Sequence, residues 1–223
     1  MRNTEKLPKE TNHDYAYRVI RENIINLEIK PGTMLSEQDI ADELGLSRTP
    51  VHEALQELSR TKIIDVRPQR GNFVNLINMD LIEESLFMRC TLESAITEMA
   101  CRIATPEQIQ QLEENLTLQE FYLKKNNLDQ IMNLDNSFHE LFYHITNKMQ
   151  CYYIVKTMNI HYDRFRELRL HASNPDVIVQ EHRQILDAFK NKDAEKAKEL
   201  CLSHLNRLHL DSKEVMKKYP QYF

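Results

Sequence analysis

The sequence predicts a mainly α-helical protein, and three features of the chain carry that prediction. Only three of its 223 residues are glycine and seven are proline, so few positions would interrupt a helix. Apolar residues recur at helical spacing over most of the chain, and no strand pattern follows residue 80. Hydrophobic residues make up 41% of the chain, which is enough to build a core.

Two helices joined by a tight turn are predicted near the N-terminus, after a bracing helix at residues 15–27. The first of the two begins after Ser36, whose hydroxyl can accept a hydrogen bond from an N–H that the helix leaves free. It ends at Gly45, because glycine enters the left-handed conformation that ends helices at little steric cost.

The second helix of this pair has a polar outer face at its start. Ser47 can cap the helix, and the apolar residues that follow recur at helical spacing. That spacing leaves Arg48, Thr49 and His52 facing outward. Such a helix start suits the major groove of DNA, where arginine can bind guanine through two hydrogen bonds and hydroxyl groups can bind phosphate.

Two short β-type runs, at residues 63–66 and 72–74, follow this helix and flank a basic turn that contains Arg70 and Gly71. We interpret the runs as a wing. A helix pair with a glycine turn is also common in ordinary all-α proteins. The caps, Gly45 and the basic hairpin occur together in one register, which favours a winged helix-turn-helix that binds double-stranded operator DNA.

The charge of this region predicts weak binding by a single copy. The whole chain has a formal net charge of −5, and residues 48–75 contain five basic and three acidic side chains. That is a small basic excess for a DNA-binding module. We therefore expect a homodimer that binds a two-fold operator.

Helix signals continue to the C-terminus, so we expect a winged helix-turn-helix domain at residues 1–76 and an all-α domain at residues 77–223. Six helices are expected at about residues 80–103, 105–125, 128–145, 151–170, 174–191 and 193–218. They should form an antiparallel bundle. The first should bury the side that includes Leu81, Met99 and Ile103.

The sequence also predicts the cellular compartment of the protein. No apolar run approaches the roughly 20 residues of a membrane span, and the first residues lack the apolar core of a signal peptide. We expect a cytoplasmic protein with no membrane partner. The four cysteines are far apart and form no C-x-x-C pair, so neither disulfides nor a thiolate zinc site are expected.

Side chains of the metal-ligand type fall on the inner faces of three predicted helices. Asp135 and His139 are four residues apart on one face, while His182 and His204 align with apolar residues of two later helices. A divalent ion such as Zn²⁺, Ni²⁺ or Mn²⁺ would satisfy all four, and this ligand set alone cannot choose among them. The alternative is an intrahelical Asp–His pair and two hydrogen-bonded core histidines.

Family resemblance supports the DNA-binding interpretation. The run LSRTPVHEALQEL and the hairpin that contains RGNFV resemble the winged helix-turn-helix of the GntR superfamily of bacterial transcription regulators. The resemblance implies that Arg48 is the main base-reading residue and that Ser47 and Thr49 lie near phosphate or base edges. It also implies that Arg70 and Gly71 form a wing tip in the minor groove.

The chain departs from this family at three positions. The family usually has arginine where this chain has His52, often arginine where it has Gln38, and commonly glycine where it has Lys62. Replacing a fixed positive charge with histidine changes the bases that can be read, so the operator sequence stays open.

The remaining two thirds of the chain resemble the FCD domain, the ligand-sensing domain of the FadR-like branch. The pattern D-x-x-F-H at residues 135–139, EHR at residues 181–183 and a later histidine carry this resemblance. It implies that the aspartate and three histidines named above hold a metal ion. It also implies that open coordination positions receive a small organic acid effector.

Arg89 is the candidate partner for that acid. It stands in the order R-x-x-L-E, which resembles the first helix of the FCD domain, and a buried guanidinium can bind a carboxylate through two parallel hydrogen bonds. The alternative is an ion pair with Glu93 one helical turn later.

Together these features predict a metal- and metabolite-responsive transcription regulator, a repressor rather than an enzyme. A rival hypothesis is a metalloenzyme whose metal activates water. The sequence disfavours it, because His139 and His144 are five residues apart rather than in H-E-x-x-H, and no glycine-rich phosphate loop occurs. A third hypothesis is a regulator whose metal is purely structural.

Overall fold

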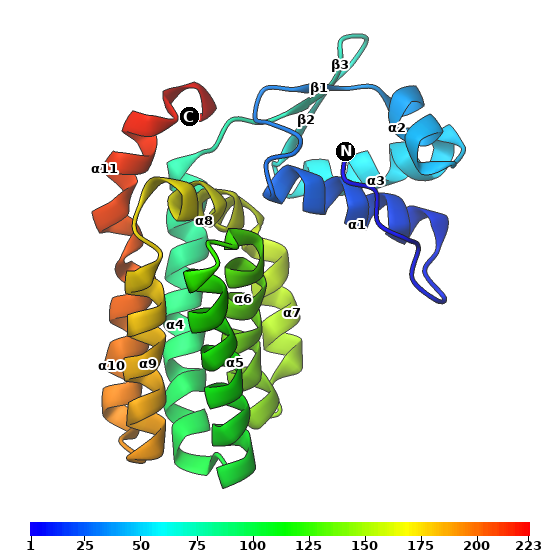
Figure 1. Ribbon diagram of the computed structural model, residues 1–223. Coiled ribbons are helices and arrows are strands. Elements are labelled where there is room, and N and C mark those ends of the chain that lie inside the picture. The colour runs from blue at the N-terminus through cyan, green and yellow to red at the C-terminus, as the bar shows by residue number, and fades with distance from the viewer.

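The computed structural model describes all residues, 1–223, and has a small head above a bundle of long helices (Figure 1). The head combines helices with a three-stranded sheet, and the rest of the chain is helical. The predicted fold class, a winged helix-turn-helix followed by a helical bundle, is therefore confirmed. No helix combines the length and apolar character that a membrane crossing requires.

The head contains the predicted helix pair and wing. Its elements are α1 (Asn12–Ile25), β1 (Met34–Leu35), α2 (Glu37–Leu44), α3 (Arg48–Arg60), β2 (Ile64–Arg67) and β3 (Gly71–Val74). The Ser36 hydroxyl accepts from the Asp39 N–H, and Gly45 ends α2 with φ at 67°. Ser47 occupies the N-cap position of α3, but its hydroxyl makes none of the predicted capping hydrogen bonds.

The wing is an antiparallel hairpin, and β1 extends it into a sheet of order β1-β3-β2. Arg67 pairs with Gly71 across the turn. The sequence did not predict β1, because two residues are too few to establish an alternating pattern.

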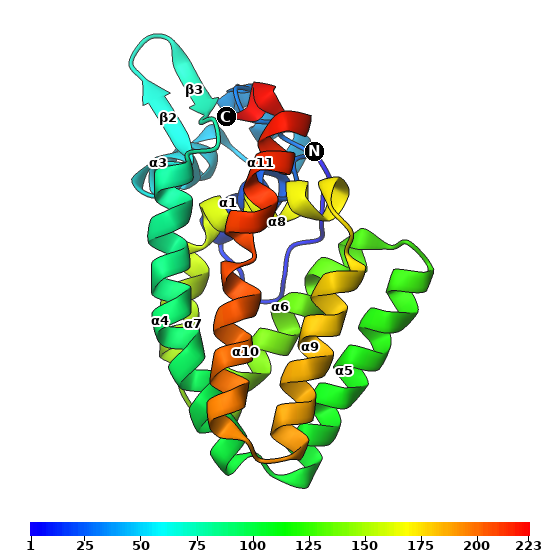
Figure 2. The same ribbon diagram turned by 90° about the vertical axis from the view of Figure 1, so that its left-hand side faces the viewer.

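Eight helices form the rest of the chain. They are α4 (Met79–Ile103), α5 (Pro106–Lys124), α6 (Leu128–Ile145), α7 (Met149–Met158), α8 (Ile160–Ala172), α9 (Asp176–Lys190), α10 (Ala194–Asn206) and α11 (Leu208–Lys218), followed by a short turn of 3₁₀ helix, η1 (Pro220–Tyr222). The predicted helix at residues 151–170 is divided at Asn159, and the predicted last helix is divided at Arg207. Figure 2 shows that these breaks let α8 run beneath the head and α11 rise beside it.

The inner face of α4 differs from the prediction. Met99 and Ile103 were expected to be buried, but they are 42% and 57% exposed. The helix instead buries the side that carries Ile82, Arg89 and Ile96. This 25-residue helix has apolar residues on several sides, so the hydrophobic pattern is compatible with more than one buried face. The face that is buried includes polar residues, which a search for apolar residues leaves out.

Helix α8 belongs to both parts of the molecule. All residues from 160 to 170 are buried. Ile160 packs in the hydrophobic core of the head, whereas Phe165 packs in the core of the bundle. The His161 Nε2–H donates to the Thr61 carbonyl over 2.7 Å, and Arg164 Nη2 donates to the Asn75 carbonyl over 2.7 Å. This helix therefore positions the head on the bundle.

Candidate functional site

The expected DNA-reading residues are all exposed on the head. Arg48, Thr49 and His52 are exposed on the first turns of α3, and Ser47 is exposed at its N-cap. Three further candidates are also exposed: Gln38 on α2, and Arg70 and Gly71 at the wing turn. Gln38 Nε2 donates to Asp42 Oδ1 over 2.8 Å.

Glu37, which the sequence did not single out, connects three parts of this surface. Its Oε2 accepts from Arg48 Nη2 over 3.0 Å, and its Oε1 lies 2.8 Å from His52 Nδ1. Asn72 Nδ2, on the wing strand β3, donates to the same Oε1 over 3.4 Å. One carboxylate of α2 thus holds two residues of α3 and one of the wing.

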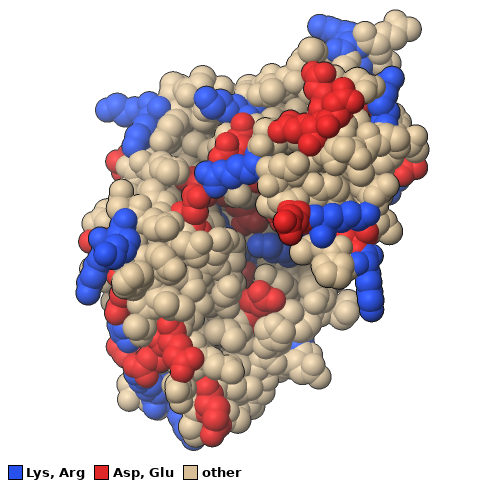
Figure 3. All heavy atoms as spheres, turned by 45° about the vertical axis from the view of Figure 1, so that its right-hand side comes forward, with Lys and Arg blue, Asp and Glu red and all other residues tan.

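The surface charge of the head is mixed. Figure 3 shows basic and acidic side chains interspersed over the head at the top of the view, with basic groups at its uppermost tip. This distribution agrees with the small basic excess of residues 48–75, where five basic and three acidic side chains occur. Electrostatic attraction to the DNA backbone by one head is correspondingly weak.

The bundle brings the four predicted metal ligands together. Asp135 and His139 come from α6, His182 from α9 and His204 from α10, and all four are buried. One ligand atom from each lies within 4.8 Å of the others. The arrangement is a buried cluster that could hold a metal ion.

The inner atoms of this cluster lie close together, and one of them lacks a hydrogen-bond partner. His139 Nε2 and His204 Nε2 are 3.3 Å apart, and His182 Nε2 is 3.6 Å from Asp135 Oδ1. His182 Nε2 is buried and makes no hydrogen bond. A buried nitrogen without a partner is costly, so the cluster is suited to a ligand at its centre.

The outer ring nitrogens face oxygen acceptors. The His182 Nδ1–H donates to Gln119 Oε1 over 2.8 Å, and the Gln119 amide nitrogen in turn donates to Asn115 Oδ1 over 2.7 Å. The His204 Nδ1–H donates to Glu181 Oε2 over 2.9 Å. These contacts place the proton on Nδ1 and leave each Nε2 lone pair directed inward.

His139 has a comparable outer neighbour, because its Nδ1 lies 3.1 Å from Glu93 Oε2. Glu93 also accepts two hydrogen bonds from Arg89, from Nε over 2.6 Å and from Nη2 over 2.9 Å. The ion pair considered as the alternative role of Arg89 is therefore formed.

The pKa shifts of Asp135, His182 and His204 favour the forms of these side chains that bind metal. Burial, reinforced by His204, holds the pKa of His182 well below its usual range. Burial also lowers the pKa of His204, partly opposed by Glu181. Burial raises the pKa of Asp135, but the Arg166 guanidinium opposes it, and the pKa of the carboxyl lies well below its usual range. Neutral imidazoles and an ionised carboxylate are the forms that bind metal.

Beside the cluster lies a small polar cavity of about 20 Å³. Its lining includes Arg89, Lys156, Arg166, Glu93 and Asp163. The cavity has three cationic and two anionic side chains around it, and a volume that suits about one water molecule.

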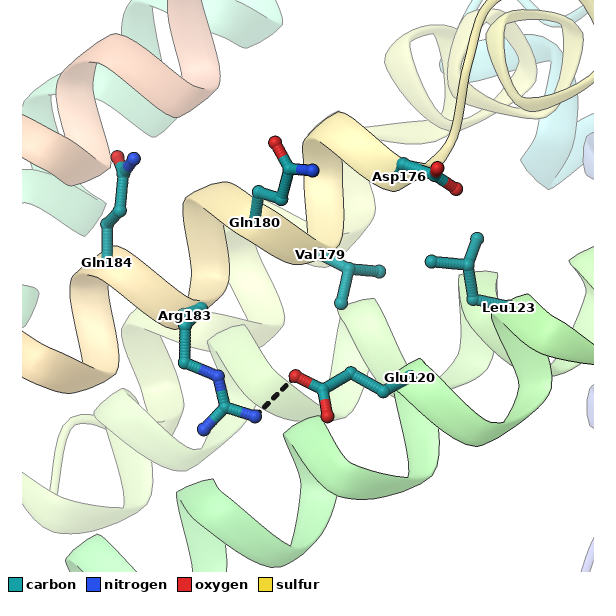
Figure 4. A pocket seen from close by; sticks show the side chains of 7 residues that line it. All are labelled: Glu120, Leu123, Asp176, Val179, Gln180, Arg183 and Gln184. Carbon is teal, nitrogen blue, oxygen red and sulfur yellow. Dashed lines mark hydrogen bonds and ion pairs between the residues drawn. The ribbon is translucent and has the colours of Figure 1, made fainter.

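A larger hollow, of about 420 Å³, lies on the surface between α5 and α9. Figure 4 shows Arg183 reaching across it to pair with Glu120. Arg183 follows His182 in the chain, but it lines this open hollow and pairs with Glu120. The candidate site is therefore the enclosed cluster rather than the larger depression.

Sequence reasoning missed the supporting residues of both sites. Arg166, which pairs with Asp135, and Gln119, which orients His182, look like ordinary surface residues of a helix. Glu181 lies within the EHR motif, which was the available signal for it. Glu37 follows a helix cap and offered no such signal.

A winged helix-turn-helix joined to a helical bundle with a buried cluster of ligand-type side chains is the architecture of a DNA-binding transcription regulator. The comparisons agree. Residues 13–74 match the gntR family of bacterial regulatory proteins, and residues 84–207 match the FCD domain. The chain belongs to the GntR family and carries an FCD domain.

Known relatives resemble the chain along nearly its whole length. The HTH-type transcriptional repressor RspR of Escherichia coli K12 is 29% identical over 221 residues, which cover 99% of this chain and 97% of the relative. The structure of E. coli McbR/YncC superposes with a TM-score of 0.77 at 23% identity, covering 96% of this chain and 99% of that one. A GntR regulator structure from Rhodococcus gives a TM-score of 0.72 at 20% identity, covering 92% and 97%. The relatives are regulators rather than enzymes.

Proposed function

We propose that this protein is a homodimeric repressor whose DNA affinity is set by a divalent metal and a small organic acid in the bundle. Asp135, His139, His182 and His204 hold the metal, and Zn²⁺, Ni²⁺ and Mn²⁺ are the candidates. The observation that carries the proposal is the convergence of one ring nitrogen from each of three histidines and one carboxylate oxygen within 4.8 Å. Repression is supported by the relative RspR, which is named a repressor.

The spacing of the inner nitrogens supports a metal rather than a hydrogen-bonded pair. His204 carries its proton on Nδ1, so its Nε2 is an acceptor, and His139 presents its own Nε2 at 3.3 Å. With the His139 proton on Nδ1, which lies 3.1 Å from Glu93 Oε2, two lone pairs would face each other at that distance and repel. Two nitrogens bound at about 2.05 Å to a tetrahedral ion lie about 3.3 Å apart, so an ion resolves the conflict.

The cavity beside the cluster supports a carboxylate effector. Its three cationic side chains outnumber its two carboxylates, and a bound metal adds positive charge at its edge. At about 20 Å³ the cavity is too small for an organic acid. An effector therefore has to displace side chains such as Arg166 or Arg89 as it enters.

Helix α8 provides the connection from this cavity to the head. Arg166 pairs with Asp135 at the cluster, while two residues of the same helix, His161 and Arg164, bond to backbone carbonyls of the head. A shift of α8 that follows the displacement of Arg166 would reposition the head. In a dimer, the separation of the two α3 helices would then no longer match the spacing of the operator half-sites.

The homodimer is supported by an exposed apolar surface on two helices that pack together. Phe87 on α4 is 75% exposed, and Ile154 and Met158 on α7 are 59% and 47% exposed. Large apolar side chains exposed in this way are typical of interfaces. A second copy covering this surface would also supply the second head that the weak charge of one head requires.

Two measurements on purified full-length protein test the proposal. The first is elemental analysis, for which we expect about one transition metal ion per chain in the wild type and a large loss in His182→Ala. The control is His144→Ala, because His144 is an exposed histidine on α6 outside the cluster. A metal-free wild type after reconstitution with Zn²⁺, Ni²⁺ and Mn²⁺ in turn would contradict the metal site.

The second measurement is fluorescence anisotropy on promoter fragments, with and without a panel of small organic acids. We expect at least one acid to change the affinity of the metal-loaded protein, and the same acid to have no effect on His182→Ala. Stabilisation by metal with no response to any acid would favour a purely structural metal.

A further inference from the structure

The recognition helix carries a histidine whose hydrogen-bonding role is fixed by a neighbouring carboxylate. His52 Nδ1 lies 2.8 Å from Glu37 Oε1. Glu37 is itself held in place, because Arg48 Nη2 and Asn72 Nδ2 donate to its two oxygens over 3.0 and 3.4 Å. The hydrogen bond from His52, partly opposed by burial, lowers the pKa of Glu37, so this side chain is an ionised acceptor.

An ionised carboxylate can only accept hydrogen bonds, so the nitrogen that faces it carries the proton. In a neutral imidazole the other nitrogen then has a free lone pair. For His52 that nitrogen is Nε2, and 53% of the His52 side chain is exposed, against 17% of that of Glu37. His52 therefore presents an acceptor at the surface where α3 meets DNA.

We propose that Glu37 makes His52 a base-reading acceptor that selects adenine or cytosine on the strand it contacts. In the major groove, adenine N6 and cytosine N4 are amino donors, whereas guanine and thymine present acceptors there. An acceptor on the protein matches the first pair and opposes the second. The arginine that the family usually has at this position prefers guanine, so the substitution reverses the preference rather than weakening it.

The same contacts assign Glu37 a positioning role. It fixes the proton of His52 and restrains Arg48 and, through Asn72, the wing. Exchange for glutamine keeps the shape of the side chain and removes the fixed acceptor. The glutamine amide can donate to Nδ1, which allows the His52 proton to move to Nε2.

The experiment is selection of randomised DNA duplexes by full-length protein at pH 8, where imidazole is neutral, followed by anisotropy with single-base variants. His52→Ala identifies the base pair that His52 contacts. We expect the wild type to prefer adenine or cytosine there. The analogue of that base that lacks the major-groove amino group, 2-aminopurine or 2-pyrimidinone, should bind roughly 5-fold or more weakly, the lower end for one base contact. His52→Arg should prefer guanine at that base pair.

Glu37→Gln should bind the four bases at this position with nearly equal affinity. Glu53→Gln is the matched control, because Glu53 is exposed beside His52 on α3 and the charge change is the same. It should keep the wild-type preference. Circular dichroism confirms that each variant is folded.

Three results would overturn the inference. One is a wild-type preference for guanine or thymine at the contacted base pair, and another is a Glu37→Gln profile identical to the wild type. The third is a base preference that His52→Ala leaves unchanged at every position. Because the selection uses no effector, these outcomes do not depend on the proposed metal and acid response.

Discussion

Arg166 on α8 and Asp135 on α6 form an ion pair in which the side chains are only 5% and 6% exposed. Removing one partner of a buried pair leaves an uncompensated charge, which typically costs about 3–5 kcal/mol. We expect Arg166→Met to lower the free energy of unfolding by about that amount in metal-free protein. The loss should be smaller with metal bound, because the ion compensates Asp135. Urea unfolding in chelator and in excess Zn²⁺ measures both values.

The control for this prediction is Arg102→Met, since Arg102 pairs with Glu98 on the surface with 55% of its side chain exposed. Surface pairs contribute about 0–1 kcal/mol, so this variant should unfold almost like the wild type. Equal losses for Arg166→Met in the two conditions would count against a metal at the cluster.

Gly45 ends α2 with φ at 67°, a conformation that costs residues with a side chain about 1–2 kcal/mol. An added Cβ would meet no atom within 4 Å, so the cost is conformational rather than steric. We expect Gly45→Ala to lower the free energy of unfolding by about 1 kcal/mol. Gly45→Asn should lower it less, because asparagine tolerates this conformation. Urea unfolding of the two variants checks the order, and the reverse order would contradict the explanation.

The stability of the protein should fall as the solution becomes more acidic, in part through His161. Burial lowers the pKa of this histidine, although its hydrogen bond to the Thr61 carbonyl opposes the shift. Protonation is thus easier in the unfolded chain, so the contribution of His161 is intact above the unfolded pKa of about 6.5. It is lost as the pH falls below that value, with a slope of at most about 1.4 kcal/mol per pH unit.

The test compares wild type and His161→Gln by urea unfolding from pH 8 to pH 5. The free energy of unfolding of the wild type minus that of the variant should decrease as the pH falls, and it can become negative. Other buried histidines contribute equally to both proteins and cancel in this difference. A difference that does not change with pH would contradict the prediction.

The exposed surface of α4 and α7 gives a prediction about assembly. We expect the wild type to sediment as a dimer and Phe87→Glu to sediment as a monomer, because a buried charge opposes association. The variant should also bind operator DNA much more weakly. Ile103→Glu is the control, since Ile103 is 57% exposed at the far end of α4. If Phe87→Glu still sediments as a dimer, the dimer interface does not include this surface.

Local signals in the sequence were sufficient for most elements. Ser36, Gly45 and Thr105 mark helix ends through contacts within a few residues, and the structure contains those contacts. The breaks at Asn159 and Arg207 were not predictable in this way, because helix-forming residues continue on both sides. These breaks depend on how α8 and α11 pack against the rest of the molecule, and the local sequence does not indicate that packing.

The residues of the candidate site also fall into two groups, those that the sequence could predict and those that it could not. The four ligand-type residues could be predicted because each interrupts an apolar stripe with a group that needs a partner. Gln119, Arg166 and Glu37 could not, since a polar residue on a helix is ordinarily solvated. Their roles depend on distances to residues more than ten positions away in the sequence.

The position of Ile160 has a consequence for synthesis of the chain. The ribosome makes residues 1–76 first, yet the core of the head includes Ile160, and residues of the same helix hold Thr61 and Asn75. The nascent head reaches its final packing only after α4 to α8 have been translated. A chain that stops before Ile160 therefore lacks the buried cluster of the bundle and one residue of the core of its head.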